Sequence, residues 1–349
     1  MPRLQRLLEA VPLPALLVDG QERIVVVNTA AAHLLGAATL GRLYPTALRQ
    51  AGVQGAIEAA LHRGEGGQAR HVVQDGASET VYRVSVTAIE EGALCVFEDV
   101  SEPEQIAQMR RDFVANVSHE LRTPLTALLG FIETLQGAAR DDPAARDRFL
   151  AVMAREAGRM NRLVGDLLSL SRVEAQERIR PTERVDIAGL IRRVLSDLRP
   201  VAAAAGVTLN PSGLDREVFL RGDADQLTQV LTNLIENAVK YGAAGKTVHV
   251  SLSRAEREQG LRGPAFRIAV RDEGEGIDAI HLPRLTERFY RVDSHRSREK
   301  GGTGLGLAIV KHILNRHRGR LRIESEQGRG STFTVILPDE EPGPAAGAV

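Results

Sequence analysis

The sequence of 349 residues contains one cysteine, no tryptophan and only 3% aromatic residues. A lone cysteine, Cys95, excludes an intrachain disulfide and fits a reducing compartment. It lies in an apolar run, so we interpret it as a core residue rather than a flavin attachment or redox sensor. The scarcity of aromatic residues argues against an aromatic ligand cage. Basic and acidic residues balance at 45 each, so overall charge does not indicate a nucleic-acid partner.

Long hydrophobic runs are also missing. No apolar run approaches the roughly 18 residues that a membrane span requires. Arg6, Glu9, Pro12 and Pro14 interrupt the N-terminal segment, which therefore reads poorly as a secretory signal. We expect a soluble, cytoplasmic protein that could join a membrane sensor complex through a separate protein. Its length predicts two or three domains, because one core rarely grows beyond about 250 residues.

Residues 11–100 read as a small α/β unit. Runs rich in branched residues at 16–18 and 24–27 flank the turn-prone Asp19-Gly20, and a helix is expected at 30–35. Two further strands are expected at 81–89 and 93–96. This pattern predicts an antiparallel sheet.

Beyond Gln105, apolar residues recur at steps of three and four, which predicts an amphipathic helix. Its stripe is Val114, Val117, Leu121, Leu125, Leu128, Ile132 and Leu135. A polar turn at 137–147 and a second stripe from Phe149 to Leu170 complete an antiparallel hairpin. One hairpin cannot bury both stripes, so we expect a second copy to complete a four-helix bundle.

After Arg180-Pro181 the pattern predicts a mixed α/β domain. Helices are expected at 187–198 and 225–241, and strands at 248–253, 266–271, 321–325 and 332–337. The tail at 339–349 has a disordered composition.

The stretch VANVSHELRTPL carries the first candidate for chemistry. At about 100° per residue, His119 faces away from the apolar stripe, where its imidazole is available as a nucleophile. Glu120 could accept a proton from it, and Pro124 should bend the helix just after the site. For an isolated His-Glu pair, a solvated surface histidine beside a routine charge would be the simpler interpretation.

Three later segments suggest a nucleotide site. In TNLIENAVKY, Asn233 and Asn237 are four residues apart and share a helix face. Their neutral amide oxygens suit Mg²⁺ as ligands. Lys240, three residues after Asn237, could contact a phosphate. In DEGEGI, a strand delivers Asp272 to a glycine loop, where its carboxylate can accept a hydrogen bond from an adenine amino group. Alone, each is also explained by ordinary surface asparagines or a strand-ending turn.

The third segment is GGTGLGLAIVKHI from Gly301, in which glycines open a helix. Free backbone N–H groups at a helix N-terminus bind phosphate. The segment matches neither the Walker A nor the Rossmann pattern. The basic stretch before it reads as a lid or as a solvated loop. Its cationic residues are Arg288, Arg291, His295, Arg296, Arg298 and Lys300.

In this order, VSHELRTPL, NLIENAVKY, DEGEGI, ERFYRV and GGTGLGLAIV resemble the sensor histidine kinases of two-component systems, over about residues 105–337. The segments starting at Phe113, Leu125 and Gly328 look most like the phosphate-regulon sensor kinase branch. The N-terminal unit, with ALLVDGQERIVVVNTAAAHLLG and the exit FEDVSE, resembles a PAS domain.

The resemblance implies a multidomain α+β chain. We expect a PAS-like α/β sensor domain at 1–100 and a helical dimerisation and histidine phosphotransfer domain at 101–180, whose hairpin forms a dimeric four-helix bundle. An α/β sandwich ATP-binding domain of the type shared with Hsp90 would follow at 181–338, with a disordered tail at 339–349.

By matched position, the resemblance implies that His119 is the phosphoacceptor, that Glu120 accepts its proton, and that Thr123 orients water when the kinase dephosphorylates its partner. ATP and Mg²⁺ are the implied cofactors, with Asn233 and Asn237 at the metal. The implied nucleotide-binding residues are Asn233, Asn237, Lys240, Tyr241, Asp272, Gly274, Gly276, Ile277, Arg288, Arg291, Gly302, Thr303, Gly304, Leu305 and Gly306.

The implied partners are a second copy and the receiver domain of a response regulator, with no direct nucleic-acid partner. Two alternatives remain at this stage: a non-catalytic nucleotide-binding scaffold, and an ATPase clamp of the superfamily that includes chaperone and mismatch-repair enzymes. Phosphohistidine separates the kinase from both.

Overall fold

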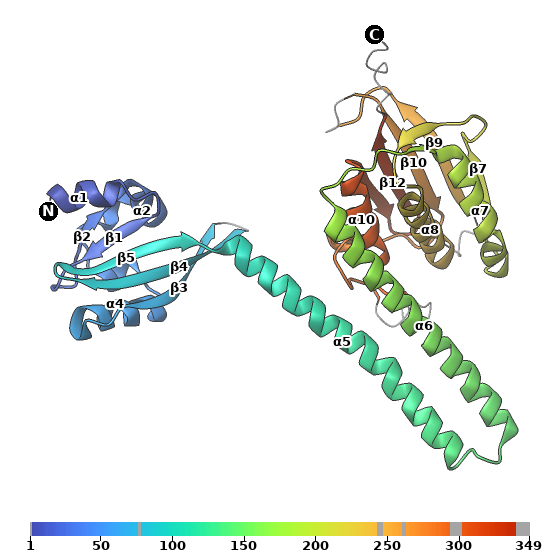
Figure 1. The fold of residues 1–349 in the computed structure, drawn as a ribbon, viewed down its shortest axis with the longest axis horizontal. Coiled ribbons are helices and arrows are strands. Elements are labelled where there is room, and N and C mark those ends of the chain that lie inside the picture. The colour runs from blue at the N-terminus through green and yellow to red at the C-terminus, as the bar shows by residue number, and fades with distance from the viewer. Residues whose placement is uncertain (1, 76–77, 243–246, 260–262, 294–301, 340–349) are drawn as a thin grey trace, which may run out of the picture. The chain divides into compact units, whose positions relative to one another are not determined.

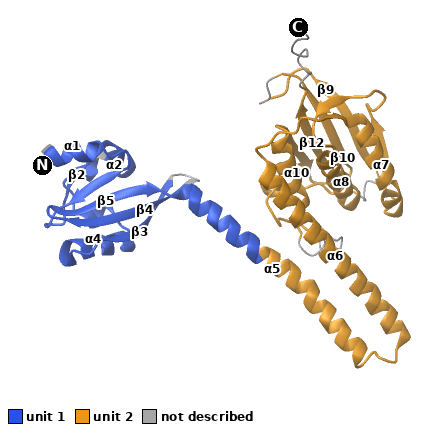
Figure 2. Cartoon of the chain, in the orientation of Figure 1, with its two compact units in different colours: residues 1–115 blue, residues 116–349 orange. Residues whose placement is uncertain are grey.

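The computed structural model describes residues 2–75, 78–242, 247–259, 263–293 and 302–339, and most of its elements are labelled in Figure 1. The chain divides into two compact units, residues 1–115 and 116–349 (Figure 2). Of the expected features, the tail from 340 onward, the lid residues His295, Arg296, Arg298 and Lys300, and Gly301 lie outside the described residues. No described helix is long and apolar enough to cross a bilayer.

The first unit is built on a five-stranded antiparallel sheet with strand order β2-β1-β5-β4-β3. Its strands are β1 (Ala15–Val18), β2 (Ile24–Val27), β3 (Gly67–Asp75), β4 (Ser78–Ile89) and β5 (Gly92–Asp99). Its helices are α1 (Pro2–Glu9), α2 (Thr29–Leu35), α3 (Tyr44–Ala47) and α4 (Ala51–Arg63), with the 3-10 turn η1 (Ala37–Thr39). The strands and helix expected here are confirmed, whereas α1, α3, α4 and β3 had no expected counterpart.

A buried asparagine joins the segments that meet at one end of this sheet. Asn28 caps α2 by accepting from Ala31 N, and it also accepts from Ala15 N. Its Nδ2 donates to the carbonyl of Leu13 at 2.8 Å. Cys95 is fully buried on β5, and burial raises the pKa of its thiol to about 12. The interpretation of Cys95 as a core residue is therefore confirmed.

Two long helices, α5 (Ser101–Gln136) and α6 (Pro143–Gln176), form the expected hairpin. The turn between them is shorter than predicted, because α6 begins at Pro143 and not after Asp147. Asp142 caps it by accepting from Ala145 N at 3.0 Å, and proline is favoured in the first helical turn. Pro124 lies inside α5, which continues through it without a break (Figure 1).

The apolar stripe of the hairpin lies largely open in a single chain. The exposed large apolar side chains are Ile106, Met109, Val114, Leu125, Leu129 and Ile132 on α5 and Leu150, Val164 and Leu168 on α6. This exposure agrees with the argument that one hairpin has too little partner surface to bury both stripes.

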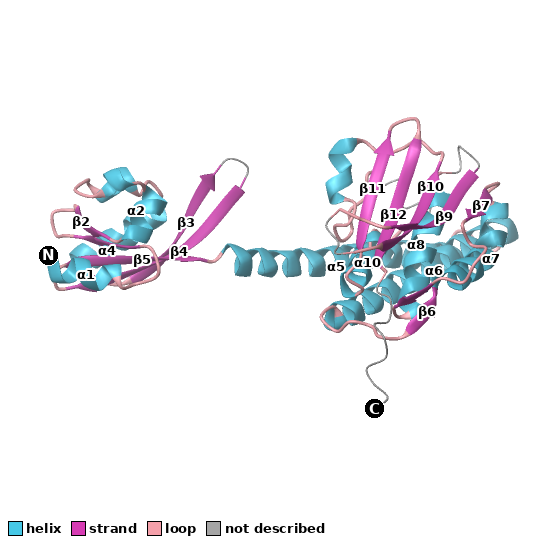
Figure 3. Cartoon of the chain, turned by 90° about the horizontal axis from the view of Figure 1, so that it is seen from above, coloured by secondary structure: helices cyan, strands magenta, loops and turns pink. Residues whose placement is uncertain are grey.

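The C-terminal part is a layer of helices on one face of a second five-stranded sheet (Figure 3). The strand order is β11-β12-β10-β9-β7, in which only the β7–β9 pair is parallel. The strands are β7 (Thr208–Ser212), β9 (Thr247–Ala255), β10 (Ala265–Asp272), β11 (Arg320–Glu326) and β12 (Gly330–Pro338). A separate pair is formed by β6 (Arg184–Asp186) and β8 (Phe219–Arg221).

The covering helices are α7 (Ile187–Ala204), α8 (Ala224–Tyr241) and α10 (Gly306–Arg316), with the 3-10 helix η2 (Ala279–Arg284). Alternate residues of β9 and β10, such as Val250 and Ile268, are buried beneath them. The four expected strands and two expected helices are confirmed. Helix α7 runs past Leu198 to Ala204, because the alanine-rich stretch beyond Pro200 sustains a helix.

Candidate functional site

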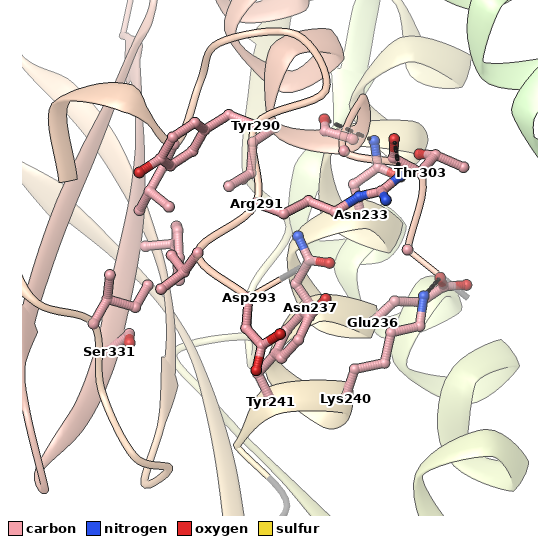
Figure 4. Close-up of a pocket in the computed structure, with 18 of the residues that line it drawn as sticks. Asn233, Glu236, Asn237, Lys240, Tyr241, Tyr290, Arg291, Asp293, Thr303 and Ser331 are labelled. Atoms are coloured by element: carbon pink, nitrogen blue, oxygen red, sulfur yellow. Dashed lines mark hydrogen bonds and ion pairs between the residues drawn. The ribbon is translucent and has the colours of Figure 1, made fainter. Parts of the chain in front are cut away.

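A pocket of about 540 Å³ opens among α8, the loop after β10, the segment that follows η2 and the start of α10 (Figure 4). This volume is in the range of small-molecule sites. Most of the expected nucleotide residues meet there. Those that line it are Asn233, Asn237, Lys240, Tyr241, Asp272, Gly276, Ile277, Arg291, Gly302, Thr303, Gly304 and Gly306.

Helix α8 supplies one wall. Asp223 caps the helix by accepting from Gln226 N, and the four-residue spacing then places Asn233 and Asn237 on the pocket side (Figure 4). Asn233 Nδ2 donates to the carbonyl of Gly306 at 3.2 Å, which directs its carboxamide toward the start of α10. Two amide oxygens beside a phosphate site fit Mg²⁺, which keeps waters and phosphate oxygens as further ligands.

Asp272 is the buried carboxylate at the base of the pocket. It is 5% exposed and accepts from Gly274 N at 2.9 Å and Ser331 N at 3.3 Å. Burial raises its pKa, whereas these backbone hydrogen bonds lower it less. Gly276, with φ of 70°, is required because a Cβ there would overlap the carbonyl of Glu326. Gly274 does not line the pocket, but its backbone N–H holds the Asp272 carboxylate in place.

The glycine-rich segment forms the phosphate side. Leu305, buried at the N-cap of α10, makes no side-chain capping bond, so the first-turn N–H groups are left for an anion. Gly304 has φ of 75°, and a Cβ there would lie 2.9 Å from the backbone of Phe289. Arg291 Nε is buried and has no hydrogen-bond partner in the described part of the chain. An unpaired guanidinium nitrogen fits a phosphate.

The hairpin supplies a wall that the sequence did not reveal. Arg162, Gly165 and Asp166 of α6 line the same pocket. Thr303 Oγ1 donates to Asp166 Oδ2 at 2.7 Å. Burial raises the pKa of Asp166, and the hydrogen bond from Thr303 lowers it less.

His119 is exposed on α5, as its position relative to the apolar stripe predicted. Thr123 Oγ1 donates to the carbonyl of His119 at 3.1 Å. Neither residue lines the pocket, but Glu120 is linked to it. Arg291 Nη2 donates to Glu120 Oε2 at 3.0 Å and to the carbonyl of Thr303 at 2.8 Å.

The other end of α6 contacts the same domain through charged groups. Arg288, which does not line the pocket, donates to Glu174 at 2.6 Å. His312 on α10 lies 3.0 Å from Glu177 and 3.6 Å from Glu174. The two contacts of His312 hold α10 against α6.

Three family models match the chain. A "PAS fold" model matches residues 8–105, a "His Kinase A (phospho-acceptor) domain" model matches 109–176, and a "Histidine kinase-, DNA gyrase B-, and HSP90-like ATPase" model matches 222–341. The second range contains His119, and the third contains the pocket residues of α8, β10 and α10.

Among curated relatives, the "Phosphate regulon sensor protein PhoR" of Pseudomonas aeruginosa is 44% identical over 241 residues, which are 69% of this chain and 53% of that protein. The "Sensor histidine kinase WalK" of Bacillus subtilis is 39% identical over 268 residues, 75% of this chain and 43% of that protein. The chain thus spans about half the length of these relatives.

Among solved structures, the histidine kinase ThkA, crystallised in complex with the response regulator protein TrrA, aligns with a TM-score of 0.51 at 20% identity. The alignment covers 96% of this chain and 98% of that one. At this identity the likeness concerns the fold.

Proposed function

This chain belongs to the sensor histidine kinases, with PAS, His Kinase A and ATPase domains in that order, and we propose that it phosphorylates its own His119 from ATP. The observation that carries the proposal is the link between the two halves of the site. Arg291, which lines the pocket, is bonded to Glu120, the residue next to His119.

ATP would lie with its adenine amino group against Asp272 and its phosphates toward Lys240, Arg291 and the first turn of α10. A carboxylate fixed by two backbone N–H groups is a rigid acceptor for the amino group. Mg²⁺ held by Asn233 and Asn237 would neutralise phosphate charge. Positioning and charge neutralisation account for most of the rate in phosphoryl transfer.

For transfer, an imidazole nitrogen of His119 attacks the γ-phosphorus in line. The N–P bond forms as the bond from phosphorus to the β–γ bridging oxygen breaks, so ADP leaves with that electron pair. The proton from the other imidazole nitrogen passes to Glu120. For this to occur, His119 must come within reach of the pocket, which it does not line.

We propose the same domain boundaries as the sequence suggested: 1–100, 101–180, 181–338 and the tail 339–349. The open apolar stripe on α5 and α6 supports a homodimer through a four-helix bundle. The phosphoryl group would then pass to an aspartate of a response regulator. Thr123, one turn from His119, would orient water when the kinase dephosphorylates its partner. The PhoR likeness supports phosphate-starvation signalling.

The test is labelling with γ-³²P-ATP. The wild type should acquire an acid-labile, alkali-stable label, and His119→Gln should abolish it while binding of a fluorescent ATP analogue survives. His62→Gln is the matched control, because His62 is an exposed histidine of the first unit. Undiminished label in His119→Gln would refute the assignment. A transfer screen against purified receiver domains would identify the partner.

A further inference from the structure

Glu120 is held across the hairpin by an arginine that no motif contains. Arg159 Nη2, on α6, lies 2.7 Å from Glu120 Oε2, on α5. The side chains are only 11% and 12% exposed, so solvent screens this pair less than a surface ion pair. Glu156, one turn before Arg159, lies 3.9 Å from its other terminal nitrogen. Arg159 is therefore fixed from two sides.

The second cation on Glu120 comes from the nucleotide site. Arg291 lies 3.0 Å from the same Oε2 and 3.4 Å from Oε1. Its side chain is 7% exposed, and its Nε has no partner in the described residues. A triphosphate in the pocket offers this guanidinium more negative charge than one carboxylate does, and bidentate phosphate binding is favourable for arginine.

The two arginines therefore differ in what happens when ATP binds. Arg291 lines the pocket and can turn to phosphate, whereas Arg159 does not line it and belongs to the same hairpin as Glu120. Withdrawal of Arg291 removes its contacts to Oε1 and Oε2. Arg159 keeps hold of Oε2.

We propose that Arg159 is the positioning residue for the proton acceptor of this kinase. It fixes Oε2 of Glu120 and so keeps the carboxylate in place next to His119 when Arg291 turns to the phosphates. During transfer the imidazole proton passes to Oε1, while the N–P bond forms and the bond to the bridging oxygen breaks. This inference rests on the proposed autophosphorylation.

The experiment measures autophosphorylation of Arg159→Met, Arg159→Lys and the control Arg155→Met. Arg155 is one turn away on α6 and is 67% exposed, so it controls for loss of an arginine from this helix. We expect Arg159→Met to lower the rate constant at saturating ATP roughly tenfold or more, with the KM for ATP unchanged. Lysine should restore part of the rate, and Arg155→Met should behave as wild type.

A second arm separates positioning from folding. In a Glu120→Gln background, whose slower labelling is followed over hours, Arg159→Met should cause no further loss, because its effect passes through the carboxylate. The same loss in both backgrounds, a rise in KM alone, or no change in rate would each overturn the inference. If wild-type protein acquires no label on His119, the proposed function fails instead. If Arg159→Met does not fold, the autophosphorylation rate constant of Arg159→Lys at saturating ATP tests the inference instead, and a wild-type value would overturn it.

Discussion

Thr303 of the glycine-rich segment donates a 2.7 Å hydrogen bond to Asp166 of the hairpin helix α6. Asp166 thereby places a half-buried carboxylate in the pocket proposed for ATP. Its pKa is raised by burial. An anion at this position opposes the phosphates and competes with them for Thr303 and for the nearby charge of Lys240.

Asp166→Asn should therefore bind ATP more tightly. The asparagine oxygen can still accept from Thr303, but the repulsion is removed, and a gain of ~1 kcal/mol corresponds to roughly fivefold in Kd. Calorimetric titration with a non-hydrolysable ATP analogue measures the change. Asp147→Asn, at an exposed site on the same helix, should leave Kd unaltered. Weaker binding in Asp166→Asn would show that the carboxylate assists ATP binding.

Asp272→Asn should weaken ATP binding without lowering the stability of the fold. Burial raises the pKa of this carboxyl above its usual 3.8. The folded state therefore favours the protonated form and loses stability as the pH rises from 3.8 through the raised pKa. Asparagine removes this cost at neutral pH and keeps an acceptor for Gly274 N. Its amide N–H₂ opposes the adenine amino group, so ATP affinity should fall at least tenfold while Tm holds or rises. Unchanged affinity, measured by titration, would refute the adenine assignment.

His317 should make the C-terminal domain sensitive to acid. Burial lowers its pKa below 6.5, and Nε2 accepts from Asp223 N at 3.0 Å while Nδ1 donates to the Ile313 carbonyl at 2.8 Å. Its stability contribution is complete above pH 6.5 and declines as pH falls from there through the lowered pKa. Protonation would set an N–H against the N–H of Asp223.

His317→Gln tests this, with denaturant titrations at several pH values. At pH 8 the variant should lose roughly 1–3 kcal/mol of unfolding free energy, because a buried hydrogen-bonded group is replaced. Between pH 6.5 and 5 its stability should decline less than that of the wild type. Parallel pH profiles for the two proteins would exclude His317 as the titrating group.

Leu129→Glu should dissociate the proposed homodimer. Leu129 is 53% exposed in the single chain and lies one turn after Leu125, at the edge of the open stripe of α5. Burying a carboxylate there costs several kcal/mol. Sedimentation equilibrium should show a monomer for Leu129→Glu and a dimer for Arg155→Glu. A dimer that withstands Leu129→Glu would place the interface elsewhere.

Much of the fold follows from local patterns. The hairpin and the sheets of both units could be predicted because their apolar periods of about 3.6 and 2 are strong. Helix α4 was missed because two glycines and small residues blur its stripe, which buries only Val53, Ile57 and Ala60. Strand β7 was missed because it contains Pro211. Proline is tolerated there because β7 is an edge strand.

The site residues likewise divide into those that local sequence motifs predict and those that only the tertiary structure reveals. The pocket residues of α8 and α10 lie in contiguous motifs, so the sequence was sufficient to find them. Arg159, Arg162 and Asp166 look like ordinary charges on a long helix, and only tertiary packing brings them to Glu120 and to the pocket. Gly165 offers only a weak local signal: a glycine inside a helix costs about 1 kcal/mol, but α6 also contains Gly158, which does not line the pocket.

Pro124 leaves α5 with a weak point at a defined place. An α-helix is stiff because each N–H is bonded to the carbonyl four residues earlier, and proline cannot donate to the carbonyl of Glu120. One main-chain hydrogen bond of α5 is therefore absent directly beside His119. A distortion transmitted along α5 would be absorbed most easily where this hydrogen bond is missing, so the most deformable part of the helix and the proposed phosphoacceptor, His119, share one stretch of backbone.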